Sequence, residues 1–461
     1  MLDLAFTAFF LFLLAAGLKR PFIWMLCYLY IDIVQPQVIS WGLLSHLPVS
    51  LIAFMAAFLG WVMFDGQKQD TRFSFRQALL VLLLFYCGAT TLTAAFPAEA
   101  LVKWSWVWKA MLFAIFMPLT LRTRLRIEAA ALVMVLAVSA LIIDGGIKTA
   151  AGGSGYGALR IFIDSNYGLF EGSIISAVAV SIIPLIIWLA RYGTVFPSDW
   201  RVWTFATALI FACSLIPVGT QARTGLICLA ILAAFYLKAS RHRILIGTGM
   251  AIALVIAVPF LPQSFLARMS TIQNHQADQS ASTRIAMWKW TWEYAKQHPF
   301  GGGFDAYRSS KVTYDTYSAE TSGSTTMVTA KPVEEEGRAY HSSYFEMLGE
   351  QGYPGFAMWI LLQLTGLVQM QIIRRRWKDR TSPDEAWVAP LAHALQMSQI
   401  VYLVGSAFVA IAFQAFILML IGLQCGLWTY LNRIDQASRK AAPGERRGMR
   451  ARPVMQVAPT V

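Results

Sequence analysis

Long apolar stretches separated by short polar connections constrain the fold of this chain more than any other feature. A helix needs about 20 consecutive, mostly apolar residues to cross a membrane. The sequence contains about thirteen candidate stretches, at residues 4–18, 21–39, 48–64, 77–96, 104–121, 127–145, 169–190, 203–219, 224–238, 243–261, 354–373, 389–410 and 414–432. Only Lys19-Arg20-Pro21 separates the first two, so a count of about twelve is also open. We therefore expect an all-α polytopic membrane protein with about 12–13 transmembrane helices.

The composition excludes a soluble globular protein. Hydrophobic residues make up 57% of the 461 residues and charged residues only 14%, whereas about 25% of an average soluble chain is charged. The net charge of +13 does not indicate nucleic-acid binding, because the lysines and arginines lie mostly between the apolar stretches. The first stretch has neither a basic segment before it nor a cleavage site after it, so we expect it to be retained as a span. The lipid bilayer is thus the first partner that the sequence predicts.

Basic residues predict which side of the membrane each connection faces, since cytoplasmic connections are enriched in lysine and arginine. Six basic groups occur at every second connection: Lys19-Arg20, Lys68 with Arg72 and Arg76, Arg122 to Arg126, Arg191 with Arg201, Arg241 to Arg243, and Arg374 to Arg376. We assign all six to the cytoplasm. The opposite face then receives the connections near residues 40–48, 97–103, 147–168, 220–223 and 262–353.

The same pattern divides the chain into four regions. These are an N-terminal transmembrane bundle at residues 1–261, a large non-cytoplasmic loop at 262–353, C-terminal transmembrane helices at 354–432 and a basic, disordered cytoplasmic tail at 433–461. Short helices are expected inside the large loop. One follows a capping residue at Ser282 and presents a face formed by Ile285, Trp288, Trp292 and Ala295, which either lies on the membrane interface or packs on neighbouring spans. Another begins at Ser343, which has capping-box spacing to Glu346, and ends near Gln351.

Neither a disulfide framework nor a metal site is indicated. The five cysteines fall within apolar stretches and none forms a CxxC pair: Cys27, Cys87, Cys213, Cys228 and Cys425. The loops on the non-cytoplasmic side contain no DxD-like acidic pair and no group of histidine, cysteine and carboxylate at ligand spacing, and we interpret the acidic run Glu334-Glu335-Glu336 as a solvated loop, so we expect no metal and no cofactor.

Four residues of the non-cytoplasmic connections form the candidate site. His341 precedes the helix expected at Ser343, and Arg160, Arg223 and Arg284 lie in loops or at helix starts on the same side. A helix N-terminus attracts anions and disfavours protonation of a nearby imidazole, and the planar fork of arginine suits phosphate oxygens. The combination predicts a diphosphate site with a neutral histidine. Each arginine alone would more often be a membrane-edge anchor, and His341 alone could be an ordinary loop residue.

At these positions the chain resembles the O-antigen ligase and polymerase superfamily (Wzy-C type). The resemblance rests on the run from Arg338 to Gly352, on Thr220 to Gly225, on Arg284 to Trp288 followed by His298 to Gly303, and on Arg20-Pro21-Phe22 with Pro36 and Trp41-Gly42. The last group is similar to exosortase-associated O-glycosylation ligases. Asp164-Ser165-Asn166 departs from the pattern of that family.

The resemblance implies a C-type glycosyltransferase fold in the bacterial inner membrane, with the active site facing the periplasm. It implies transfer of a glycan from undecaprenyl diphosphate to lipid A-core sugar, to protein or to a growing glycan, without metal. His341 is then the catalytic residue, and Arg223, Arg284 and Arg160 bind the diphosphate. Three alternatives stay open: an O-antigen polymerase, a protein O-oligosaccharyltransferase and, less favoured, a transporter of lipid-linked glycan. A transporter should carry ionisable residues at mid-membrane. Lys109 and His393 are the main polar residues within the apolar stretches and no internal repeat is evident, so transport is the weaker alternative.

Overall fold

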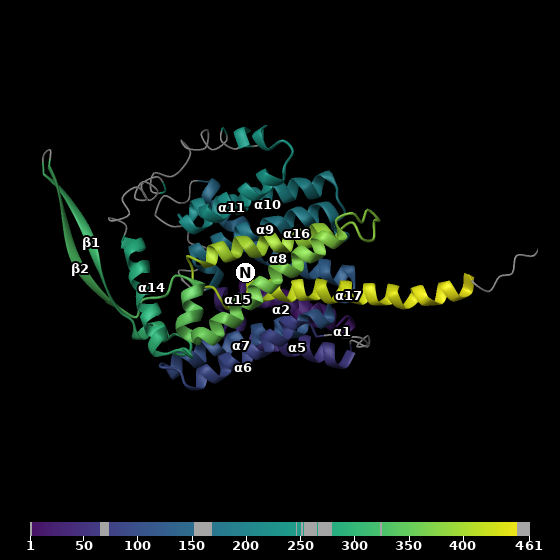
Figure 1. Ribbon diagram of the computed structural model, residues 1–461, viewed down its shortest axis with the longest axis horizontal. Coiled ribbons are helices and arrows are strands. Elements are labelled where there is room, and N and C mark those ends of the chain that lie inside the picture. Colours follow the sequence, from purple (N-terminus) through teal and green to yellow (C-terminus); the bar gives the residue numbers. More distant parts are fainter. Residues whose placement is uncertain are drawn as a thin grey trace, which may run out of the picture.

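The computed structural model of the protein shows a bundle of helices with a β-hairpin at one end (Figure 1). It describes residues 2–64, 73–151, 168–245, 247–249, 252, 265, 279–322 and 325–449. The first half of the bundle contains α1 (Leu2–Lys19), α2 (Phe22–Val34), α3 (Pro36–Ile39), α4 (Leu43–His46), α5 (Val49–Phe64), α6 (Phe75–Leu92), α7 (Pro97–Thr120), α8 (Arg124–Ala150), η1 (Gly168–Phe170) and α9 (Gly172–Tyr192). The second half contains α10 (Trp200–Gly219), α11 (Arg223–Ala239), α14 (Gln279–Gln297), η3 (Ala306–Ser309), β1 (Lys311–Ser322), β2 (Thr325–Glu336), α15 (Ser343–Trp377), α16 (Val388–Ser406) and α17 (Ala415–Met449).

The predicted all-α polytopic membrane fold is confirmed. Seven of the described helices are long and apolar enough to cross a membrane, namely α6, α7, α8, α9, α10, α15 and the first part of α17. Two shorter apolar helices, α2 and α5, accompany them. The total of about 12–13 spans stays a prediction, and most of the stretch at residues 243–261 lies outside the described residues.

Burial of the spans shows which helices form the centre of the bundle. In each span we consider an apolar segment of 18 residues. Of this segment, 83% is buried inside the protein in α9 and 78% in α17, but only 33% in α10. Small residues allow the central helices to approach closely: a Cβ atom on Gly405 of α16 would lie 2.7 Å from the Cβ atom of Ala177 of α9. Close packing through small residues is typical of helices in membranes. We conclude that α9 is central and that α10 lies at the outside of the bundle.

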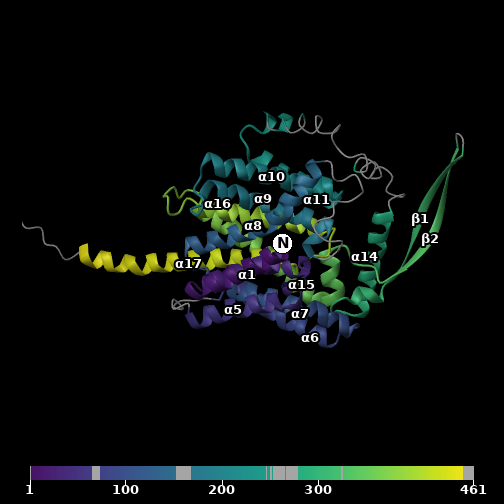
Figure 2. The same ribbon diagram turned by 180° about the vertical axis from the view of Figure 1, so that it is seen from behind.

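The described basic connections gather at one end of the bundle, as the alternation of basic groups predicts. Arg124, the first residue of α8, donates hydrogen bonds from its guanidinium to the carbonyl oxygens of Tyr192 at 2.9 Å and Pro383 at 3.3 Å. The guanidinium of Arg126 lies 4.9 Å from the ring centre of Phe22, next to the Lys19-Arg20 connection. We call this the basic end. In Figures 1 and 2 it is the end from which α17 extends, and α14 and the hairpin mark the opposite loop end.

Arg76 is an exception to the prediction for basic connections. Its side chain is fully buried in the first turn of α6, rather than exposed at the surface. A Cβ atom on Gly366 would lie 2.5 Å from Nη2 of Arg76 and 3.0 Å from Oε1 of Gln424, so both side chains lie against the backbone of α15 at this glycine. The charge alternation could predict the end of the bundle at which Arg76 lies, but not that its helix packs it inside.

Residues 433–449 also differ from the prediction. The structure continues α17 through Met449, where the sequence predicted a disordered tail. Alanine and arginine, both good helix formers, make up seven of the 17 residues of this segment, although Pro443 and Gly444 also lie in it. Asp435 within it forms a salt bridge to Arg376 at 2.6 Å, which fastens the start of the extension to the end of α15.

The hairpin of β1 and β2 was not predicted from the sequence. The two strands pair antiparallel from Lys311 opposite Glu336 to Ser322 opposite Thr325. Val312 and Tyr314 are buried, so they mark the face that packs on the protein. The alternation of β-branched and aromatic residues with polar ones after Lys311 is the signal that indicates a strand here.

The glycine triplet Gly301-Gly302-Gly303 supports a kink in α15. At Gly352 the helix has φ 62° and ψ −167°, which is not helical. The kink releases the carbonyl oxygens of Gly349 and Glu350, and these accept hydrogen bonds from the backbone N–H groups of Gly302 at 3.0 Å and Gly303 at 2.9 Å. The triplet thus replaces helix hydrogen bonds that the kink removes.

Replacing Gly352 by alanine should destabilise the fold. A Cβ atom there would clash with the carbonyl oxygen of Pro299, and positive φ is unfavourable for a residue with a side chain. Backbone strain of this kind costs about 1–3 kcal/mol, so the melting temperature of the purified protein should fall by a few degrees. Gly249→Ala is the matched control, because nothing lies within 4 Å of a Cβ atom there. Equal melting temperatures for both variants would contradict the strained contact.

Candidate functional site

The first turn of α15 is fastened to the connection between α16 and α17. The Oγ atom of Ser343 donates to the carbonyl oxygen of Val409 at 3.0 Å and accepts from the backbone N–H of Ile411 at 2.8 Å. Glu346 accepts from the backbone N–H of Ala412 at 3.0 Å. The predicted capping box is therefore wrong: the cap position is Ser342, which makes no side-chain cap hydrogen bond, and Ser343 and Glu346 bind a distant segment instead.

A buried lysine links α7 to the same face of α15. The Nζ atom of Lys103 lies 2.8 Å from carboxylate oxygens of both Glu346 and Glu350. The side chain of Lys103 is only 13% exposed, that of Glu346 5% and that of Glu350 0%. The two glutamates are four residues apart, so one helix face presents both to Lys103. Glu350 also accepts a hydrogen bond from the backbone N–H of Asp305 at 3.0 Å.

A pocket of about 310 Å³ opens beside this ion-pair cluster. Its polar lining includes Lys103, Asp305, Tyr307 and Glu346, and its apolar wall comes from the connection before α17. Burial raises the pKa of Asp305 above its usual value, while Lys103 and Arg308 act in the opposite direction. Tyr307 packs edge-on against Tyr340, with ring centres 5.6 Å apart. The pocket therefore lies close to the residue that precedes His341.

His341 occupies the turn that leads into α15. It has φ 50°, a left-handed conformation that is uncommon for a residue with a side chain. Burial, together with the positive charges of Arg284 and Arg338, lowers the pKa of His341 to about 4. The imidazole is thus neutral at pH 7. Within the part of the chain that the structure describes, neither of its ring nitrogens forms a hydrogen bond.

Helix α14 brings Arg284 to His341. One turn after Arg284, the indole N–H of Trp288 donates to the carbonyl oxygen of Tyr340 at 3.0 Å. The Trp288 ring also stacks on Phe345, with ring centres 5.1 Å apart and planes 7° apart. These contacts hold α14 against the start of α15, which explains why the charge of Arg284 acts on His341.

The structure divides the predicted face of α14 between buried and exposed positions. Thr283, Met287, Thr291 and Ala295 are buried at four-residue intervals, whereas Ile285 is 51% exposed and Trp292 49% exposed. Helix α14 also begins at Gln279, so Ser282 lies inside it and is not its cap. Of the predicted face, Ala295 is buried and Trp288 packs against the start of α15. The exposed Ile285 and Trp292 agree with the membrane-interface alternative.

Arg338 is a site residue that the sequence analysis did not select. Its positive charge acts on His341, and its guanidinium pairs with Glu335 at 3.3 Å. Its backbone N–H donates to Ser310 at 3.0 Å, so the end of the hairpin holds it in place. Its position three residues before His341 is the only signal in the sequence.

Arg223 lies at the loop end of the bundle, as predicted. It is the first residue of α11, directly after Gln221, which has φ 54°, and Ala222. Cys228 lies about one and a half turns after Arg223 and packs against Gly405 of α16. Gly405 in turn is two residues before the connection that binds Ser343. The start of α11 and the start of α15 therefore lie at the same end of the bundle, with the side chain of Arg223 half-buried.

Two other predictions for the site are not tested. Arg160 and Asp164-Ser165-Asn166 lie outside the described residues. Across the described ranges, no three histidine, cysteine or acidic side chains are placed to hold a metal ion, and the expected absence of a metal remains a prediction.

Comparison with protein families supports the resemblance found in the sequence. Residues 208–360 match the O-antigen ligase family, and this range contains Arg223, Arg284, Arg338 and His341. Residues 1–194, which contain Lys103, match a family of unknown function (DUF5935). The comparison with curated proteins finds no match.

Removing the charge of Lys103 should destabilise the protein strongly. Lys103→Met leaves Glu346 and Glu350 buried without their cation, and breaking a buried ion pair costs about 3–5 kcal/mol. Thermal unfolding of the purified protein should show a large fall in melting temperature. The control is Lys296→Met, which removes an exposed pair with Glu293 and should leave the melting temperature nearly unchanged. Similar melting curves for the two variants would contradict the structural role of Lys103.

Proposed function

We propose that this chain, a multi-pass membrane protein with an O-antigen ligase domain at residues 208–360, transfers a glycan from undecaprenyl diphosphate to an acceptor by an inverting, metal-independent reaction. The observation that carries the proposal is a half-buried His341 kept neutral beside two arginines at the start of a helix. A neutral imidazole can accept a proton, and the cations can stabilise an anionic leaving group. Together these are the two requirements of glycosyl transfer from a diphosphate.

The diphosphate is bound by arginine in this proposal. Arg284 and Arg338 both act electrostatically on His341, and Arg223 lies at the same end of the bundle. Guanidinium groups bind phosphate oxygens two at a time and stay charged at any physiological pH. The positive end of the α15 dipole adds to the same field. Arg160 is proposed to close over the headgroup, although it lies outside the described residues.

In the reaction, the acceptor hydroxyl oxygen attacks the anomeric carbon from the face opposite the diphosphate. A new C–O bond forms while the bond from carbon to the diphosphate oxygen breaks, so the configuration inverts. His341 takes the hydroxyl proton, and undecaprenyl diphosphate leaves with the electron pair. The charge that develops on the leaving group is stabilised by Arg284 and Arg223.

The pocket beside Lys103 suits the sugar next to the reacting centre. Its volume of about 310 Å³ is near the lower limit of small-molecule sites. Asp305 and Tyr307 offer a carboxyl group and a hydroxyl group for hydrogen bonds to sugar hydroxyls. We therefore place a glycan unit there, next to the diphosphate at His341.

The location and the acceptor also belong to the proposal. Because basic connections face the cytoplasm, the basic end is placed on that side of the bacterial inner membrane and His341 faces the periplasm. Lipid A-core sugar is the acceptor we favour over protein. An O-antigen polymerase would instead lengthen the glycan on its carrier lipid, so analysis of the products distinguishes these activities.

His341→Ala should reduce transfer by about 10²–10⁴-fold, because that is the usual contribution of a well-placed general base. The measurement is product formation by the purified variant with lipid-linked donor and a panel of acceptors, without any energy source. His298→Ala is the control, since His298 is an exposed histidine of the same loop that stacks on Tyr294. Near wild-type turnover of His341→Ala, with normal donor binding, would remove His341 from the mechanism.

Arg284→Gln should move the acid limb of the pH–rate profile to higher pH. The general base works only when neutral, and His341 with a pKa of about 4 stays neutral well below pH 6.5. Removing the charge of Arg284 raises that pKa, so activity should be lost at a higher pH as the solution is acidified. The position of the limb at saturating donor is the readout, because the variant also binds diphosphate less tightly. Lys296→Gln at the far end of α14 should leave the limb in place, and an unmoved limb in Arg284→Gln would contradict the coupling.

A further inference from the structure

The pocket beside the ion-pair cluster, which we call the loop-end pocket, is acidic in a protein that is basic overall. The chain has a net charge of +13. Among the described residues that line the loop-end pocket, however, Lys103 is the one cation, against the carboxylates of Asp305 and Glu346. Lys103 is already bound by Glu346 and Glu350, each of which has an oxygen 2.8 Å from its Nζ atom. The lining described by the structure therefore offers no unpaired cation to an acidic ligand.

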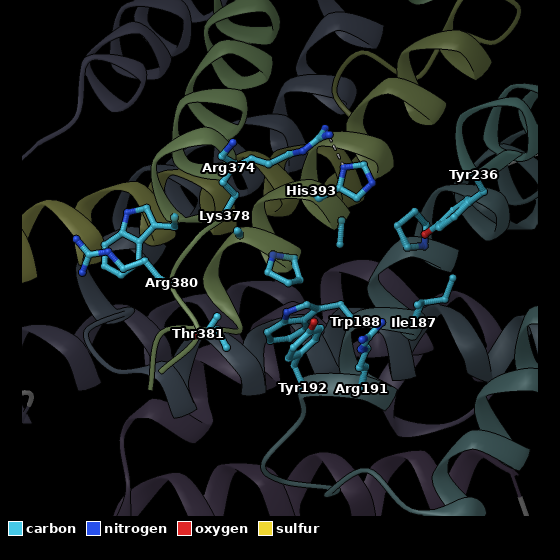
Figure 3. A pocket seen from close by; sticks show the side chains of 16 residues that line it. Ile187, Trp188, Arg191, Tyr192, Tyr236, Arg374, Lys378, Arg380, Thr381 and His393 are labelled. Carbon is cyan, nitrogen blue, oxygen red and sulfur yellow. Dashed lines mark hydrogen bonds between the residues drawn. The ribbon is translucent and has the colours of Figure 1, made fainter. Parts of the chain in front are cut away.

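A second pocket, at the basic end of the bundle, shows that this acidity is a local feature. It has a volume of about 590 Å³, and Arg191, Arg374, Lys378 and Arg380 are among its lining residues (Figure 3). None of the described residues that line it is acidic. The two pockets are thus opposite in charge, so the acidic lining of the loop-end pocket needs its own explanation.

Asp305 is the carboxylate of the loop-end pocket that a ligand can use best. Its side chain is 19% exposed, and Nε of Arg308 lies 3.9 Å from it, beyond hydrogen-bond distance. Within the described part of the chain, no group donates a hydrogen bond to this carboxylate. By contrast, the carboxylates of Glu346 and Glu350 accept hydrogen bonds from Lys103 and from backbone N–H groups. A ligand with hydroxyl or amino hydrogens would supply the donors that Asp305 lacks.

The backbone holds Asp305 at the pocket. The residue has φ 59°, a left-handed conformation that aspartate and asparagine adopt more readily than most residues. Its backbone N–H donates to Glu350 at 3.0 Å, so the buried ion-pair cluster fixes the residue. Unusual backbone conformations held by the surrounding structure are frequent at ligand sites. The Asp305 carboxylate is therefore presented to the pocket in a defined position.

We propose that Asp305 selects the charge of the glycan unit next to the reacting centre, so that the loop-end pocket binds a neutral sugar or an amino sugar and rejects a uronic acid. This inference rests on the proposed transfer function and names the class of glycan that the site accepts. Hydroxyl and ammonium groups can donate hydrogen bonds to Asp305, whereas the ionised carboxylate of a uronic acid can only accept them.

Charge repulsion acts in the same direction. The carboxylate of a uronic acid in the loop-end pocket would lie near Asp305 and Glu346, and like charges brought together at a binding site disfavour the wrong partner. Arg284 and Arg338, whose charges act on His341, do not line this pocket. They are assigned to the diphosphate in the proposed reaction and leave the acidic lining uncompensated.

The test measures sugar binding and glycan transfer by the same purified full-length protein in lipid nanodiscs, where no glycoside detergent competes. Binding is followed by saturation-transfer NMR at pH 7 with methyl hexosides, methyl hexosaminides that have a free amino group, and methyl hexuronides, each in the gluco and galacto series. Transfer is measured with lipid-linked donors that carry the same sugars.

Two variants with similar chemistry distinguish Asp305 from its surroundings. Asp305→Asn removes the charge and keeps the shape, and asparagine tolerates the left-handed backbone. Glu99→Gln is the matched control, because Glu99 is a carboxylate 3.9 Å from Arg308 that does not line the loop-end pocket.

The wild type and Glu99→Gln should bind hexosides and hexosaminides about tenfold or more tightly than hexuronides, because a like charge in the pocket is disfavoured. In Asp305→Asn this preference should shrink severalfold, and hexosaminides should lose the most affinity. Equal binding of all three classes by the wild type, binding of none, or the same loss of preference in Glu99→Gln would overturn the proposal.

Failure of the transfer function gives a different result. The expected order of binding without transfer from any donor would contradict the transferase and support the charge selection by Asp305. Transfer at equal rates from neutral and uronic acid donors would support the transferase and overturn the charge selection.

Discussion

The ion-pair cluster of Lys103 with Glu346 and Glu350 is the interaction on which the site end of this protein depends. It joins α7 to the first two turns of α15, across 243 residues of sequence for Glu346 and 247 for Glu350. Ser343 and Glu346 fasten the same turns to the segment before α17. Since His341 is two residues before this fixed helix start, the cluster also decides where the imidazole lies. A lysine and two glutamates removed from water are costly to keep, and they are tolerated here because each is satisfied by several partners.

The same arrangement separates two electrostatic environments within about one helix turn of each other. Toward the bundle, Glu346 and Glu350 are paired with a buried lysine. Toward the loop, the positive charges of Arg284 and Arg338 act on His341, and burial lowers the pKa of its imidazole. A substrate diphosphate would bring the negative charge that the loop side lacks. The protein therefore provides cations and a neutral base on the side where the leaving group is proposed to bind, which favours diphosphate departure.

Much of the fold could be predicted from the sequence because local sequence patterns determine it. Apolar stretches predicted the helices, and the basic connections predicted which helix ends gather together, as the contacts of Arg124 confirm. The proximity of Arg284 to His341 was also predicted from their shared side. What could not be predicted are long-range contacts: Lys103 with its glutamates, burial of Arg76, and Ser343 binding Val409 instead of capping its own helix. Local rules for caps and helix faces were overridden at α14 and α15, where tertiary packing supplied closer partners.

A structure of the protein with bound undecaprenyl-diphosphate glycan would test the central claim most directly. The prediction is that diphosphate oxygens lie within hydrogen-bond distance, about 2.7–3.2 Å, of the guanidinium groups of Arg284 and Arg223, with the imidazole of His341 facing the anomeric carbon. A donor whose diphosphate binds at the basic end, or at the loop end but beyond the reach of both arginines and His341, would contradict it.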